Sequence, residues 1–110
     1  MDLQTICWQF SADSSVLNDI QQIKTTLHEL AERSQLTVVE QTQHEFDPQG
    51  VSIAMVLAES HIAAHTWPEQ AKGYIVLTTC RPLPQTAIDD SNQLLNQSLK
   101  CSELEVQVMP

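Results

Sequence analysis

Residues 53–69 of the chain read IAMVLAESHIAAHTWPE, and this stretch joins an apolar run to a dense set of reactive side chains. The run at residues 53–58 is aliphatic and bounded by polar residues, which is typical of a buried strand. Glu59, Ser60, His61 and His65 follow at the exit of that strand. Buried polar groups cost free energy unless they are satisfied, and such departures from local folding rules gather at functional sites. We therefore expect the functional segment to lie directly after this strand.

The rest of the chain alternates between strand and helix patterns around this segment. Strands are predicted at residues 5–10, 36–42 (continuing towards Phe46), 51–58, 73–79 and 104–108, from period-two alternation and β-branched residues. The turn sequence at residues 47–50 contains Pro48 and Gly50 and predicts an antiparallel hairpin between the second and third strands. A second helix is predicted at residues 86–100.

The first helix is expected to begin after the possible caps at residues 11–15 and to run to about Arg33. Apolar residues recur along it at helical spacing and should be buried: Leu17, Ile20, Ile23 (or Lys24), Leu27, Leu30 and Ala31. The opposite face is assigned to solvent: Asp19, Gln22, Thr26 and Glu29. The predicted order is β-α-β-β-β-α-β, an α+β two-layer sandwich with a largely antiparallel sheet and two helices on one face. A second protomer is expected to cover the other sheet face or an edge.

Composition limits the class of protein. The 110 residues form one domain, residues 1–110, and 42% hydrophobic content argues for a globular fold. The chain lacks a membrane-length apolar run and a signal-peptide pattern, which argues for a cytoplasmic protein. The three cysteines, Cys7, Cys80 and Cys101, are an odd number without metal-ligand spacing, so neither a disulfide framework nor a metal is expected. A net charge of −9 argues against nucleic acid as a partner.

The segment at residues 59–69 resembles the processing and catalytic segment of the bacterial S-adenosylmethionine decarboxylase proenzymes. In that family a Glu-Ser-His tripeptide precedes an Ile/Val-His-Thr-Trp-Pro-Glu run. The matching residues follow in order without a gap: Glu59, Ser60, His61, His65, Thr66, Trp67, Pro68 and Glu69. Cys80, eleven residues after Glu69, and Ser52, eight residues before Ser60, also match.

The resemblance implies a built-in cofactor, a pyruvoyl group derived from Ser60, which forms a Schiff base with the substrate amine and accepts electrons during decarboxylation. The Ser60 hydroxyl would attack the Glu59 carbonyl, and β-elimination would leave a β chain of residues 1–59 and an α chain of residues 60–110. His65 matches the histidine that transfers protons during processing. Cys80 matches the proton donor to the decarboxylated carbon. The resemblance also implies a homodimer, with active sites near the contact between subunits.

Other residues carry weaker expectations. Ser52 matches a serine near the ester intermediate, and eight-residue spacing would place it on the same strand face as Ser60; an ordinary strand serine is an equal alternative. Phe46, Trp67 and Glu69 match the substrate's nucleoside site, through stacking and acceptance from ribose hydroxyls; otherwise Phe46 and Trp67 are core residues. His61 is a candidate for positioning the precursor. Cys7 and Cys101 match no family site.

The resemblance implies conversion of S-adenosylmethionine to the decarboxylated aminopropyl donor for spermidine. Two alternatives stay open. Ile53, Val76 and Arg81 depart from the family pattern, which leaves room for a pyruvoyl-dependent decarboxylase of another amino acid, arginine or ornithine. A chain that stays uncut would instead be a non-catalytic homologue that binds a ligand or a partner.

Overall fold

A six-stranded antiparallel sheet forms one layer of the computed structural model, which describes residues 2–109. The strand order is β2-β3-β4-β5-β1-β6, and every neighbouring pair is antiparallel. The strands are β1 (Gln4–Ser11), β2 (Val38–Glu45), β3 (Val51–Leu57), β4 (Ser60–Trp67), β5 (Lys72–Thr79) and β6 (Glu103–Met109). The helices are α1 (Ser14–Leu17), α2 (Ile20–Arg33) and α3 (Gln85–Leu99), with a 3₁₀ turn η1 at Pro68–Gln70.

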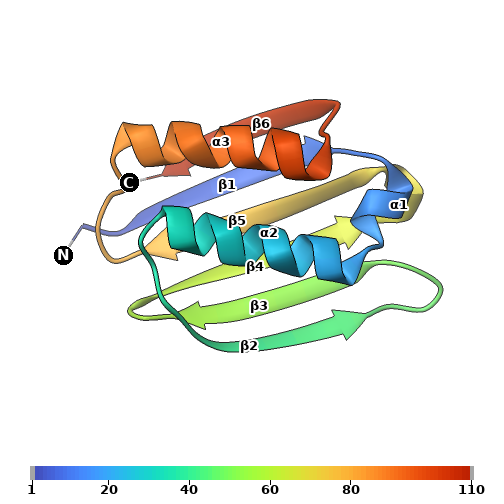
Figure 1. The fold of residues 1–110 in the computed structure, drawn as a ribbon, viewed down its shortest axis with the longest axis horizontal. Coiled ribbons are helices and arrows are strands. Elements are labelled where there is room, and N and C mark those ends of the chain that lie inside the picture. The colour runs from blue at the N-terminus through green and yellow to red at the C-terminus, as the bar shows by residue number, and fades with distance from the viewer. Residues whose placement is uncertain (1, 110) are drawn as a thin grey trace.

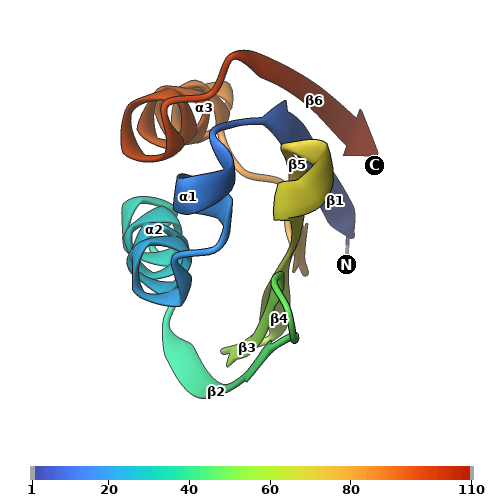
Figure 2. The same cartoon turned by 90° about the vertical axis from the view of Figure 1, so that its right-hand side faces the viewer.

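All three α-helices lie against the same face of the sheet, so the fold has two layers (Figures 1 and 2). The predicted α+β class, the antiparallel hairpin of β2 and β3 and the position of α3 are confirmed. No helix within residues 2–109 is long and apolar enough to cross a membrane.

The core lies between the helices and one sheet face. Strand residues alternate into it, and the fully buried ones include Ile6, Trp8, Ile53, Met55, Ile62, Ile75 and Leu77. The predicted apolar stripe of α2 packs against them, as do Ile88, Leu94, Leu95 and Leu99 of α3. The buried indole of Trp8 also donates to Asn92 Oδ1 at 2.7 Å, which satisfies its N–H.

The first predicted helix is two helices. The side chain of Asp19 accepts a hydrogen bond from the Gln22 N–H and starts α2 from an extended backbone conformation, so the helical path is broken after Leu17. Asn18, in the break, accepts from the Gly50 N–H at 2.9 Å and ties the β2–β3 turn to the helices. The break therefore joins the helix layer to one end of the sheet.

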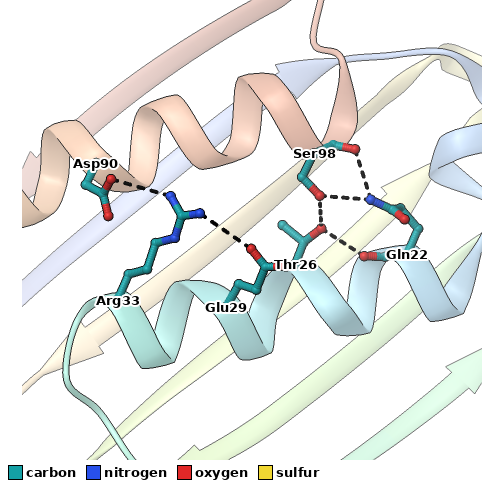
Figure 3. Close-up of polar contacts among 6 residues, drawn as sticks. All are labelled: Gln22, Thr26, Glu29, Arg33, Asp90 and Ser98. Atoms are coloured by element: carbon teal, nitrogen blue, oxygen red, sulfur yellow. Dashed lines mark hydrogen bonds and ion pairs between the residues drawn. The ribbon is translucent and has the colours of Figure 1, made fainter.

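Thr26 was assigned to solvent, and this assignment is wrong. Thr26 is fully buried between α2 and α3, where its hydroxyl lies in hydrogen-bond contact with Ser98 Oγ and the Gln22 carbonyl (Figure 3). Gln22 Nε2 donates to Ser98 O and Oγ, and Arg33 pairs with Asp90 farther along the same helix contact. The helix pair is thus held by polar as well as apolar contacts.

The segment after β3 was expected to be an exit from a strand, and it is a strand itself. β4 begins at Ser60, pairs with β3 through Leu57–Ser60 and continues to Trp67. Its Ile62, Ala64 and Thr66 are buried towards the helices, which leaves His61, Ala63 and His65 on the opposite face. The polar residues concealed this alternation, so the predicted element order lacked one strand.

The face opposite the helices, the open face, is not covered by any helix of the described residues (Figure 2). One cross-strand row on it runs His44–Ser52–His65–Tyr74–Gln9–Glu105. The next row, Thr42–Ala54–Ala63–Val76–Cys7–Gln107, has small and apolar residues at its centre. An apolar sheet centre of this kind is suited to burial against another surface.

Candidate active site

Ser60 opens β4, directly after the tight turn that joins it to β3. Glu59, the second residue of this turn, has a positive φ of 65° although it carries a side chain. Such conformations cost free energy and cluster at active sites. The Ser60 hydroxyl is buried and has no hydrogen-bond partner among residues 2–109. The peptide bond between Glu59 and Ser60 therefore joins a strained residue to an unbonded nucleophile.

Cys80 lies next to this turn, because β5 runs antiparallel to β4 and ends at Thr79. Its Sγ contacts Glu59 Oε2 at 3.9 Å. A pocket of about 430 Å³ at this end of the sheet is lined by Ser34, Glu59, Ser60, Cys80 and Arg81, among others. We call the turn, Cys80 and this pocket the Ser60 end of the sheet.

Ser52 and His65 form a second cluster. They are cross-strand partners on the open face, and a hydrogen bond joins Ser52 Oγ and His65 Nδ1 at 2.7 Å. The His65 ring packs on Tyr74, with ring centroids 5.1 Å apart, and Tyr74 stacks on Trp67 at 5.8 Å. Because Nδ1 is engaged by Ser52, Nε2 is the nitrogen left free for proton transfer. These four residues form the His65 end of the sheet.

The expectation that Ser52 and Ser60 share a strand face is wrong. Ser52 lies on β3 and Ser60 on β4, and the pairing sets Ser52 against His65 and Ser60 against Leu57. Along β4, Ser60 is five residues from His65, a span of about 16 Å at the usual rise per residue. The alternation also turns the two side chains to opposite faces. Within one chain the structure does not bring His65 and Ser52 to Ser60.

The residues expected to bind the nucleoside lie towards the His65 end. Trp67 is 41% exposed and lines a second pocket of about 420 Å³ together with Tyr74, Gln9, Glu103 and Glu105. Phe46 is 50% exposed and packs edge-on against His44, and Glu69 is exposed in η1. Neither Phe46 nor Glu69 lines this pocket.

Tyr74 and Glu105 were missed by the sequence reasoning. Tyr74 is an intermediate-burial residue of an ordinary strand pattern, and only the pairing of β4 with β5 places it beside His65. Glu105 comes from the far end of the chain and reaches the same row through β1. The alternation of each strand indicates which of its residues lie on the open face. It identifies Tyr74 and Glu105 as neighbours of His65 only when the order of the strands in the sheet is also known.

The remaining cysteines and histidines lie outside both ends. Burial raises the pKa of the Cys7 and Cys101 thiols, which keeps them protonated, and Cys101 Sγ donates to the Leu95 carbonyl. His61 is exposed on the open face opposite Thr78, and His28 contacts Gln41. Residues 2–109 contain no cluster of three or more side chains suited to holding a metal ion.

Comparison with known proteins assigns the chain to a family. A family model described as S-adenosylmethionine decarboxylase matches residues 4–110. The chain belongs to this family. The S-adenosylmethionine decarboxylase proenzyme of Acidithiobacillus ferrooxidans (strain ATCC 53993) is 34% identical over 100 residues, which cover 91% of this chain and 74% of that protein. The proenzyme of Prochlorococcus marinus (strain MIT 9313) is 37% identical over 90 residues, or 82% and 70% of the two chains.

Solved structures of the family have the same fold. The adenosylmethionine decarboxylase of Aquifex aeolicus superposes with a TM-score of 0.79 at 23% identity, covering 97% of this chain and 87% of that one. The Trypanosoma brucei enzyme gives a TM-score of 0.67 at 15% identity, covering 97% of this chain and 45% of that one. At these identities the likeness concerns the fold, and the family assignment rests on the sequence matches.

Proposed function

We propose that this chain is a self-cleaving, pyruvoyl-dependent decarboxylase of S-adenosylmethionine. The observation that carries the proposal is the Glu59–Ser60 turn, in which a left-handed Glu59 precedes a buried serine hydroxyl without a protein partner. Family membership supports it, because the relatives from Acidithiobacillus ferrooxidans and Prochlorococcus marinus are named proenzymes.

Self-cleavage would begin when Ser60 Oγ adds to the Glu59 carbonyl carbon while its proton passes to a base. The bond from that carbon to the Ser60 nitrogen then breaks, and the nitrogen takes up a proton, which leaves an ester. Elimination across the Ser60 Cα and Cβ frees Glu59 as the carboxyl end of residues 1–59 and leaves a dehydroalanine at residue 60. Water would then hydrolyse the imine tautomer of that residue to the pyruvoyl group, with release of ammonia. Release of the positive-φ turn favours the cut state.

The Ser60 end fits the pyruvoyl group, because residue 60 borders a 430 Å³ pocket together with Cys80 and Arg81. When present, the group supplies the electron sink that amino-acid side chains lack. Cys80 lies beside Glu59, and in this proposal its thiol donates a proton to the substrate carbon after decarboxylation. Trp67 and Tyr74 form an aromatic wall suited to a planar base or a sulfonium cation.

We further propose that the working unit is a homodimer joined through the open faces. His65 and Ser52 lie about five residues along the strand from Ser60, so one chain does not complete the processing site. Two sheets stacked face to face about a two-fold axis that runs across the strands would place the His65 end of one copy over the Ser60 end of the other, on the open-face side of the Glu59–Ser60 turn. The small residues Ala54, Ala63 and Val76 would lie at the centre of that contact.

A second substrate class is favoured by one observation. The pocket beside Trp67 is also lined by Glu103 and Glu105, and such acids suit a guanidinium or ammonium side chain. Arginine and ornithine therefore stay as alternative substrates. An uncut chain would instead fit the non-catalytic binding homologue.

Release of labelled carbon dioxide from carboxyl-labelled S-adenosylmethionine, arginine and ornithine tests the proposal. We expect release from S-adenosylmethionine, and none from any substrate with Ser60→Ala. Release from arginine or ornithine alone would show that the substrate is one of these amino acids, while the proposed decarboxylation would stand. No release by cleaved protein would contradict the proposal.

A further inference from the structure

Two buried side-chain polar atoms lack hydrogen-bond partners within residues 2–109, and both are serine hydroxyls at one pocket. They are Ser34 Oγ and Ser60 Oγ, and both residues line the 430 Å³ pocket of the Ser60 end. Ser34 is only 7% exposed. Buried hydroxyls are normally bonded, so an unbonded pair in one pocket calls for a physical reason.

The segments that carry the two serines are in direct contact. The Ala58 N–H, in the turn before Ser60, donates to the Thr37 carbonyl at 2.9 Å, in the connection after Ser34 (Figure 1). Each serine is also adjacent to a left-handed residue, Gln35 with φ 59° and Glu59 with φ 65°. The pocket is thus built where two strained backbone segments meet.

Among the described residues, the Ser34 hydroxyl makes no hydrogen bond that caps α2. Ser34 is the C-cap of α2, and its backbone N–H closes the last turn by donating to the Leu30 carbonyl at 3.1 Å. The other hydroxyls at the pocket are accounted for, because Thr79 Oγ1 donates to the Arg81 carbonyl and Thr37 is exposed to solvent. Ser34 is therefore the buried hydroxyl of the pocket that is free to bond to Ser60.

We propose that Ser34 is a positioning residue for self-cleavage, a role that rests on the proposed function. Its hydroxyl binds the Ser60 hydroxyl through one water molecule in the pocket and holds Ser60 Oγ towards the Glu59 carbonyl carbon. Ser34 keeps its proton throughout, since the Ser60 proton passes to the base and the Ser60 nitrogen is protonated when the peptide bond breaks. Orientation of a nucleophile within bonding reach is a large part of an intramolecular rate.

The test follows the appearance of residues 60–110 over time by intact mass, alongside the melting temperature of each uncut protein. Ser34→Ala should slow cleavage at least about tenfold. Its melting temperature should stay close to wild type, because the substitution removes no protein hydrogen bond. Ser34→Thr, which keeps the hydroxyl, should restore most of the rate.

Ser91→Ala is the matched control. Ser91 is a fully buried serine of α3 whose hydroxyl donates to the Ala87 carbonyl at 2.8 Å, and it does not line the pocket. This variant should melt at a lower temperature and cleave at the wild-type rate.

Cleavage of Ser34→Ala at the wild-type rate would overturn the positioning role while leaving the proposed function intact. If Ser34→Ala fails to fold, Ser34→Thr decides: near wild-type cleavage supports the role, and slow cleavage in a folded protein overturns it. A wild-type chain that never cuts would overturn the proposed function and this role together.

Discussion

His65 and Cys80 lie at different ends of the sheet, so we expect their substitutions to stop different steps. His65 is held by Ser52 with Nε2 free, which suits a proton acceptor for the Ser60 hydroxyl. His65→Ala should therefore leave the chain uncut or cut slowly. Intact mass against time checks this, with His28→Ala as the control because the His28 ring hydrogen-bonds to Gln41. Normal cleavage by His65→Ala would remove the histidine from processing.

Cys80→Ala should still cut at Ser60, because the thiol takes no part in breaking the peptide bond. Carbon dioxide release by the cut protein should fall by about 10²–10⁴-fold, the usual contribution of a general acid. The matched control is Cys7→Ala, since Cys7 lies in the apolar row of the open face. Full activity in folded Cys80→Ala protein would show that this thiol is only packing.

At the residue scale, the sequence supplied candidate site residues but not their places in the sheet. Ser60, His65 and Cys80 are recognisable from one contiguous motif and a fixed spacing. Their separation into two ends depends on strand pairing, which links residues far apart in the chain. Because β4 was not recognised as a strand, Ser52 and Ser60 were treated as residues of one strand. The turn before Ser60 puts them on neighbouring antiparallel strands, so an even spacing no longer means a shared face.

Among the elements, the β3–β4 hairpin is held to the helix layer through Thr66. Its buried hydroxyl accepts from the Val51 N–H at 3.0 Å and donates to the Leu17 carbonyl at 2.8 Å. Thr66→Val keeps the shape and leaves both backbone groups unpaired, which should lower the free energy of unfolding by about 1–3 kcal/mol. Urea unfolding of the uncut Ser60→Ala background measures it.

Thr42→Val is the control for that substitution. It makes the same chemical change at a residue of β2 that is exposed to solvent. It should alter the unfolding free energy little. Equal effects of the two substitutions would show that the Thr66 hydrogen bonds do not stabilise the hairpin.

The boundaries of helices and strands were predicted well where the apolar residues follow a single strand or helix period. The strands β1, β5 and β6 and the helix α3 lie within one residue of their predicted limits, because apolar alternation and a helical stripe mark them. The break between α1 and α2 was missed, since the apolar stripe passes through it and only the capping role of Asp19 reveals it.

At the scale of the whole molecule, a shared site predicts complementation between two inactive variants. Ser60→Ala chains keep His65, and His65→Ala chains keep Ser60, so a mixed dimer contains one complete processing site. We expect each variant alone to stay uncut, and the His65→Ala chains to cut after the two are unfolded and refolded together. Absence of cleavage in the mixture, with wild type cut under the same treatment, would place processing within one chain.

The central claim is that the Glu59–Ser60 bond breaks itself, and an intact-mass spectrum of freshly purified wild-type protein tests it most directly. We expect two chains, residues 1–59 and 60–110, with the second one lighter than a serine-initiated chain by the mass of one ammonia and showing a carbonyl terminus that borohydride reduces. Ser60→Ala should give one uncut chain of 110 residues. A single uncut wild-type chain after prolonged incubation would contradict the account.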